Sequence, residues 1–141
     1  MKILVSACLL GEPCRYDGES RPCARVIDLQ KEHILIPVCP ECAGGLSVPR
    51  PACERQSDGS VRTADGKDRT AEYALGAELS LMRAKHHGCA LAILKSRSPA
   101  CGVGRVYDGS FTRTLTDGDG VLTELLKKHG VAVYTEESFP L

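Results

Sequence analysis

The sequence predicts a single α/β domain over residues 1–141, in which helices cover both faces of a mostly parallel sheet. Two observations lead to this prediction. Four short apolar runs are continuously hydrophobic rather than alternating, which is typical of strands buried on both faces. Segments with helical spacing separate these runs, and such alternation favours right-handed crossovers within one sheet. A chain of this length can bury roughly two-thirds of its unfolded surface, so its core needs no disulfides.

The expected strands cover residues 3–7, 34–38, 89–94 and 131–134. A helix is expected over residues 71–87, with Thr70 as its N-cap and Gly88 at its C-terminal stop. Residues 120–129, which lie between Asp119 and Gly130, form a second expected helix, and residues 23–32 a weaker third. These elements together predict a Rossmann-like three-layer sandwich.

Residues 47–69 are polar and rich in turn-forming dipeptides, including Asp58-Gly59 and Asp65-Gly66. We expect this segment to form a hairpin or a lid inserted into the domain.

The charge pattern excludes some classes of partner. The formal net charge is zero and no long basic or acidic run occurs, which argues against nucleic acid or an anionic membrane as the main partner. No apolar stretch approaches the roughly 20 residues of a transmembrane helix. The apolar run before Cys8 is shorter than the roughly 7–15 residues of an export signal core. We therefore expect a cytoplasmic protein.

Eight cysteines are a large number for 141 residues. In a reducing compartment they indicate metal binding or catalysis rather than disulfides, although about half are expected to be small buried apolar residues. Cys8 and Cys39 each directly follow an expected strand, and Cys101 lies seven residues beyond the third. Because ligands of open α/β sheets bind outside the carboxyl ends of the strands, these three cysteines are expected to converge there.

Three converging thiolates suit an iron–sulfur cluster in which one iron has no protein ligand. Zinc held by three cysteines and water is the alternative metal. Cys39 and Cys42 form a C-x-x-C pair, which leaves a thiol–disulfide site open. Such a site would need the pair to open a helix, and Gly44-Gly45 argues against that.

Polar residues near these cysteines are candidates for chemistry. The carboxylate of Glu41 could act as an acid or base, and the Ser98 hydroxyl could bind substrate or relay a proton. Arg15, Tyr16 and Asp17 follow Cys8 closely and could orient a planar heterocycle.

The structural alternatives are a solvated loop for Glu41 and ordinary turns for Ser98 and for Asp17-Gly18. Ser96 joins the candidates for substrate binding, because it lies two residues before Ser98. Four cysteines have no partner that the sequence indicates: Cys14, Cys23, Cys53 and Cys89. Cys89 is expected to pack at the start of a buried strand.

Three blocks resemble the thiouracil desulfidase family, long catalogued as a domain of unknown function (DUF523): VSACLLGEPCRYDG, PVCPECAGGLSVPRPACE and LKSRSPACG, followed by YDG and DGDGV. The resemblance covers residues 3–135. It implies a [4Fe-4S] cluster held by Cys8, Cys39 and Cys101 with one open iron. It also implies that Glu41 and Ser98 are catalytic.

The activity implied by the resemblance is removal of sulfur from a thiolated pyrimidine, such as 2-thiouracil, without net redox change. The open iron would bind the thiocarbonyl sulfur, and water activated by Glu41 with help from Ser98 would attack the ring carbon. The expected partner is a small thiolated heterocycle, bound by a monomer or weak homodimer. The family more often has an apolar residue at the position of Cys42 and proline at that of Cys53. These extra thiols leave a sulfur carrier or sensor as an alternative function.

Overall fold

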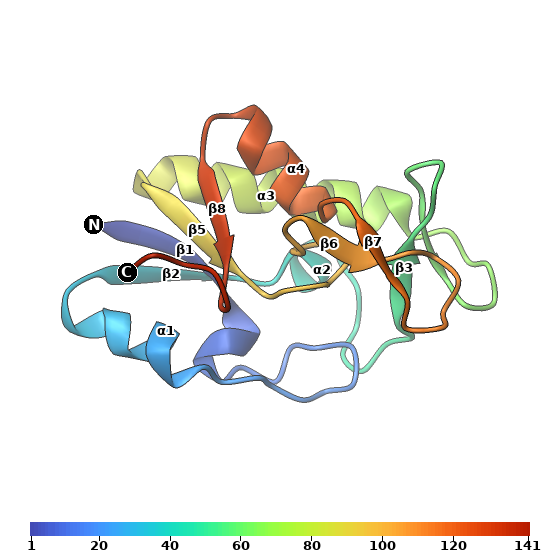
Figure 1. Cartoon of the computed structure of the whole chain (residues 1–141), viewed down its shortest axis with the longest axis horizontal. Helices are drawn as coiled ribbons and strands as arrows, with labels where there is room; N and C mark the ends of the chain where they lie inside the picture. Colours follow the sequence, from blue (N-terminus) through green and yellow to red (C-terminus); the bar gives the residue numbers. More distant parts are fainter.

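The computed structural model describes residues 1–141 and confirms the α/β prediction. Its centre is a parallel four-stranded sheet in the order β2-β1-β5-β8 (Figure 1). The strands are β1 (Lys2–Ser6), β2 (Ile34–Val38), β5 (Leu91–Leu94) and β8 (Ala132–Thr135). All four expected strands are therefore present, with ends shifted by no more than two residues. The side chains of Ile3, Leu4 and Val5 are fully buried, as expected for a central strand that is covered on both faces.

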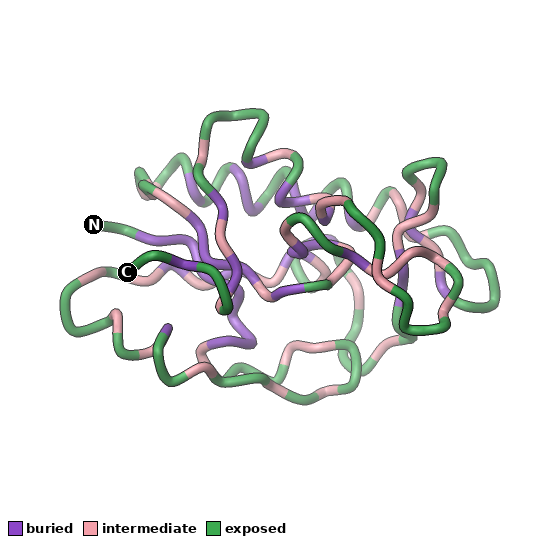
Figure 2. Tube along the Cα trace, in the orientation of Figure 1, coloured by how far each residue is buried: buried purple, intermediate pink, exposed green.

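Helices cover the two faces separately. On one face α3 (Thr70–His87) packs beside α4 (Val121–Lys128) (Figure 1). On the other face lie α1 (Ala24–Asp28) and the short η2 (Leu29–Lys31), together with Phe139 of the C-terminal segment. The Arg25 guanidinium lies 4.6 Å from the centre of the Phe139 ring. Buried residues concentrate along the sheet and the helix surfaces that face it (Figure 2). Three layers result, as the sequence predicts.

The ends of α3 confirm one expectation and correct another. Gly88 follows the helix with φ 66°, a left-handed conformation that glycine adopts without steric cost. The prediction of Thr70 as N-cap was wrong, because Thr70 is the first helical residue. Its Oγ1 accepts the Val61 N–H at 3.0 Å, while Asp68 Oδ1 accepts the Thr70 N–H at 2.9 Å. Asp68 therefore binds a free N–H group at the start of the helix.

The C-x-x-C pair does open a helix, contrary to expectation. Cys39 immediately precedes α2 (Pro40–Ala43), and Pro40 at its first position has the backbone angle that a helix start requires. Gly44 and the following glycine end the helix rather than prevent it. Likewise, Cys89 is half-buried and lies just before β5 rather than within it.

Two antiparallel hairpins lie beyond the carboxyl edge of the sheet (Figure 1). Within residues 47–69, β3 (Cys53–Arg55) pairs with β4 (Val61–Thr63). The sequence did not predict the second hairpin, of β6 (Arg105–Tyr107) and β7 (Leu115–Asp117). The buried carboxylate of Glu54 joins the two, because its Oε1 accepts the N–H groups of Gly109 and Phe111 at 3.0 and 3.1 Å. The hairpins are thereby tied together beside the strand ends.

The strand order places a crevice at the carboxyl edge. From β1 the chain continues through α1 to β2 on one side, and it returns through α3 to β5 on the other side. The helices of these two connections lie on opposite faces, so the winding direction reverses at β1. Open α/β sheets bind ligands at such a reversal.

Candidate active site

A cavity of about 450 Å³ lies at this reversal, within the size range of small-molecule sites. Its lining comes from the loops after β1, β2 and β5 and from both hairpins. Cys8, Cys39 and Cys101 all line it. Cys8 lies in the 3-10 helix η1 (Ala7–Leu10) that follows β1, Cys39 lies between β2 and α2, and Cys101 lies in the turn region after β5. The structure thus brings together three cysteines that are distant in sequence, all of them free thiols.

The three thiols differ in their electrostatic surroundings. Burial raises the pKa of Cys8 to about 11 and raises that of Cys101 as well. The pKa of Cys39 is lowered to about 5, mainly because the Cys14 thiol donates a hydrogen bond to it. Metals bind thiolates rather than thiols. Of the three cysteines, Cys39 loses its proton most easily, whereas Cys8 and Cys101 would each have to release a proton in order to bind a metal.

Cys14 is a member of the site that the sequence did not assign. It lines the cavity, and its backbone carbonyl lies 3.7 Å from the Cys39 sulfur. The hydrogen bond between the two thiols, together with burial, raises the pKa of Cys14. The sequence feature that could have indicated it is its position six residues after Cys8, within the block VSACLLGEPCRYDG.

Glu41 enters the cavity from α2, and Arg50 holds it there. Their side chains form an ion pair with an Oε2–Nη2 distance of 3.5 Å. The Arg50 side chain is only 5% exposed, and it also donates to the carbonyl oxygens of Cys14 and Ser47 at 3.0 and 3.1 Å. Burial raises the pKa of Glu41 to about 7, with the Cys39 charge adding to the rise and Arg50 opposing it. A carboxyl group with a pKa near neutrality is suited to proton transfer.

Ser98 and Ser96 both line the cavity but have different hydrogen-bond partners. Ser98 Oγ accepts the Cys101 N–H at 2.7 Å, which leaves its hydroxyl proton free. The hydroxyl and the backbone N–H of Ser96 both donate to the Glu136 carboxylate, at 3.2 and 2.8 Å. Lys95 Nζ completes this group, 3.0 Å from Glu136 Oε2. Ser98 is thus free to donate into the cavity, while Ser96 is fixed by Glu136.

The loop after η1 places Arg15 and Tyr16 in the cavity wall, with Asp17 outside it. The Arg15 guanidinium lies 5.5 Å from the centre of the Tyr16 ring. Asp17 Oδ1 lies 3.5 Å from Arg15 Nε, an ion pair that leaves this buried N–H without a hydrogen bond. Asp17 therefore orients Arg15, and the buried Nε–H of Arg15 is an unsatisfied donor in the cavity wall.

Comparison with known proteins identifies the family. The family model described as 2-thiouracil desulfurase matches residues 3–138. This chain belongs to that family. A curated relative, "Uncharacterized protein YbbK" of Bacillus subtilis (strain 168), is 37% identical over a 143-position alignment that covers 95% of each chain. A solved structure, "[4Fe-4S]-dependent thiouracil desulfidase TudS", is 46% identical with a TM-score of 0.92, over 99% of this chain and 93% of that one.

The thiols of this 2-thiouracil desulfurase family member are arranged differently from the ligands of a single metal ion. No three His, Cys, Asp or Glu side chains are grouped closely enough to hold a single metal ion. In a cubane cluster, by contrast, each thiolate binds its own iron. The lining has two acidic side chains, Glu41 and Glu54, and six basic ones: Arg15, Arg21, Arg50, Lys95, Arg97 and Arg113. Five of the six basic groups form ion pairs with carboxylates, most of which lie just outside the lining. The basic side chains are therefore held in place by these carboxylates.

Proposed function

We propose that this chain is a [4Fe-4S]-dependent desulfidase that replaces the sulfur of a thiolated pyrimidine, such as 2-thiouracil, with oxygen. One observation carries the proposal: Cys8, Cys39 and Cys101 line a single cavity that also contains Glu41 and the free hydroxyl of Ser98. Membership of the 2-thiouracil desulfurase family and the resemblance to TudS support it. The reaction consumes water and releases the oxo-base and hydrogen sulfide, with no net oxidation or reduction.

The donor set fits the cluster. Cys8, Cys39 and Cys101 would each hold one iron, and the fourth iron would have no protein ligand. When bound, the cluster supplies a Lewis-acidic iron for the thiocarbonyl sulfur.

The remaining chemistry belongs to side chains of the cavity. Glu41 accepts a proton from the water that attacks the ring carbon, and Arg50 fixes its orientation. The Ser98 hydroxyl donates a hydrogen bond to the attacking water or to the ring. Arg15 and Tyr16 orient the planar ring, with Asp17 positioning Arg15 and Ser96 shaping the wall beside Lys95.

The substrate in this proposal is a free small molecule rather than nucleic acid, and the enzyme acts in the cytoplasm as a monomer or weak homodimer. No helix in the structure has the length and apolar character needed to cross a membrane.

The decisive experiment is strictly anaerobic purification with iron and acid-labile sulfide counted. We expect about four irons per chain, the content of one cubane cluster, and conversion of 2-thiouracil to uracil with release of one sulfide. Colourless protein that holds one zinc ion, or that takes up no iron on reconstitution, would refute the proposal.

Single variants separate the roles. Cys8→Ala, Cys39→Ala and Cys101→Ala should each lose both cluster and turnover. Glu41→Ala should keep the cluster and lose turnover. Cys89→Ala is the matched control, because Cys89 is half-buried beside the core and does not line the cavity.

A second candidate function is thiol–disulfide exchange through Cys39 and Cys42. The observation that favours it is that Cys39 immediately precedes α2, the usual position of a reactive C-x-x-C pair. Cys42→Ala distinguishes the two functions, since exchange requires this exposed thiol and desulfuration does not. A sulfur carrier, which needs no acid–base group, is distinguished by Glu41→Ala.

A further inference from the structure

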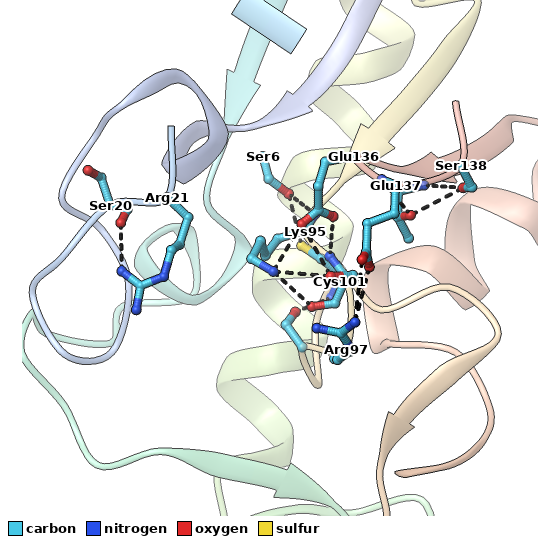
Figure 3. Close-up of polar contacts among 12 residues, drawn as sticks. Ser6, Ser20, Arg21, Lys95, Arg97, Cys101, Glu136, Glu137 and Ser138 are labelled. Atoms are coloured by element: carbon cyan, nitrogen blue, oxygen red, sulfur yellow. Dashed lines mark hydrogen bonds and ion pairs between the residues drawn. The ribbon is translucent and has the colours of Figure 1, made fainter. Parts of the chain in front are cut away.

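Ser6 is buried beside a proposed cluster ligand and has no role in the mechanism above. It is the last residue of β1 and is 3% exposed. Its Oγ lies 2.9 Å from the backbone nitrogen of Lys95 and 3.5 Å from the sulfur of Cys101 (Figure 3). One hydroxyl therefore joins the carboxyl ends of two neighbouring strands to a cysteine of the site.

The direction of these hydrogen bonds follows from the donors available. A backbone N–H can only donate, so Ser6 Oγ is the acceptor toward Lys95. The hydroxyl proton is then left for the Cys101 sulfur, and burial keeps water from competing for it. A metal-bound thiolate is a stronger acceptor than a neutral thiol, because charge strengthens the bond.

The surroundings hold Ser6 in this orientation. Lys95 Nζ lies 3.0 Å from Glu136 Oε2, and Glu136 Oε1 accepts the N–H of Ser96 at 2.8 Å. Glu136 thus holds both the Lys95 side chain and the next peptide N–H, and these contacts restrain the segment whose Lys95 N–H donates to Ser6. Of the three cavity cysteines proposed as ligands, Cys101 is the one whose sulfur accepts a hydrogen bond from a hydroxyl group.

We propose that Ser6 is a positioning residue that tunes the cluster through the sulfur of Cys101. Its donated hydrogen bond stabilises the more negative, reduced state, and so raises the reduction potential of the cluster and makes its oxidation harder. The inference rests on the proposed function, because it requires a cluster bound to Cys101. For a reaction without net redox change, the consequence is a cluster that resists oxidative loss between turnovers.

The test compares two variants of nearly equal shape. Ser6→Thr keeps the hydroxyl, whereas Ser6→Val replaces it with a methyl group, so any effect of extra volume is common to both. Ser80→Ala is the control for loss of a buried hydroxyl elsewhere, since Ser80 Oγ donates to the Gly76 carbonyl within α3. Each protein is purified with its cluster, and the midpoint potential is measured by a redox titration followed by electron paramagnetic resonance.

We expect wild-type potential in Ser6→Thr and Ser80→Ala, and a lower potential with faster loss of iron in air for Ser6→Val. Resonance Raman spectra provide a second measurement. In the wild type and in Ser6→Thr, the frequency of an Fe–S(Cys) band should shift when H₂O is replaced by D₂O, because the hydroxyl proton exchanges. In Ser6→Val the contribution of this hydroxyl group to the shift should be lost. Equal potentials and equal deuterium shifts in the Thr and Val variants would overturn the proposal.

The outcomes also separate this inference from the proposed function. Wild-type protein that binds no iron would refute both the proposed function and the role of Ser6. If the wild type binds four irons and converts 2-thiouracil, but Ser6→Thr and Ser6→Val have the same potential and deuterium shift, only the role of Ser6 is refuted. If Ser6→Val bound no cluster while Ser6→Thr retained it, the hydroxyl would be required for ligation by Cys101, and this result would support the role.

Discussion

Replacing Gly76 by alanine tests how rigidly the helix pair α2–α3 positions the site. The two helices meet at glycines, and a Cβ added at Gly76 would lie 1.8 Å from the Pro40 carbonyl oxygen. Real Cβ atoms do not approach within 3.0 Å, so the start of α2 has to move by about 1.2 Å or more. Pro40 stands between Cys39 and Glu41, so this movement reaches a proposed ligand and the proposed base together.

Two opposing contributions determine how much Gly76→Ala changes the stability of the fold. Alanine in a helix interior is favoured over glycine by about 1 kcal/mol, whereas overpacking costs about 1–3 kcal/mol. The net loss of stability for Gly76→Ala is therefore small, about 0–2 kcal/mol. A misplacement of about 1 Å in an active site reduces the rate roughly 100-fold. We thus expect a large loss of turnover in a protein that still folds.

The assay measures 2-thiouracil turnover per bound cluster, together with the free energy of unfolding in urea. Glu78→Ala is the control, because Glu78 is exposed on the same helix. The reasoning would be refuted if Gly76→Ala kept wild-type turnover and gained about 1 kcal/mol of stability. The higher helix propensity of alanine would then be the only effect, and α2 would accommodate the added methyl group without cost.

Three further predictions concern contacts around the cavity and the core. Arg50→Met should cost about 1–3 kcal/mol of unfolding free energy, because the carbonyl groups of Cys14 and Ser47 lose their donor while Glu41, with a pKa of about 7, becomes neutral. An unchanged urea midpoint would contradict this prediction. Glu54→Ala should cost about 1–3 kcal/mol and speed hydrogen exchange at the Gly109 amide, and unaltered protection would argue against this link between the hairpins. Phe139→Ala should cost about 3–5 kcal/mol in thermal or urea unfolding, and a loss below 1 kcal/mol would show that the C-terminal segment contributes little to the core.

The sheet was predictable because its strands are continuous apolar runs, a strong signal even in segments of four or five residues. The three cavity cysteines followed from the same signal, since Cys8 and Cys39 directly follow β1 and β2. That Cys101 lines the same cavity depends on the pairing of β5 with β1, a strand order that the sequence analysis did not predict.

What the sequence did not predict consists of short elements and of contacts between distant loops. Strands β6 and β7 have three residues each, and their sequences Arg-Val-Tyr and Leu-Thr-Asp have no distinctive period. The position of Arg50 against Glu41 depends on the path of a turn-rich segment, which local propensity does not determine. The contact between Cys14 and Cys39 likewise joins two loops that are separated by a whole β-α-β unit.

The order of the strands also bears on when the site comes into being during synthesis. The three cavity cysteines belong to the loops after β1, β2 and β5, which are adjacent in space although Cys8 and Cys101 lie far apart in the chain. A nascent polypeptide emerging from the ribosome therefore has no complete thiol triad until Cys101 is outside the exit tunnel and β5 has paired with β1. In the proposed enzyme the cluster therefore cannot gain all three cysteine ligands before this late stage, when β1, β2 and β5 have already assembled.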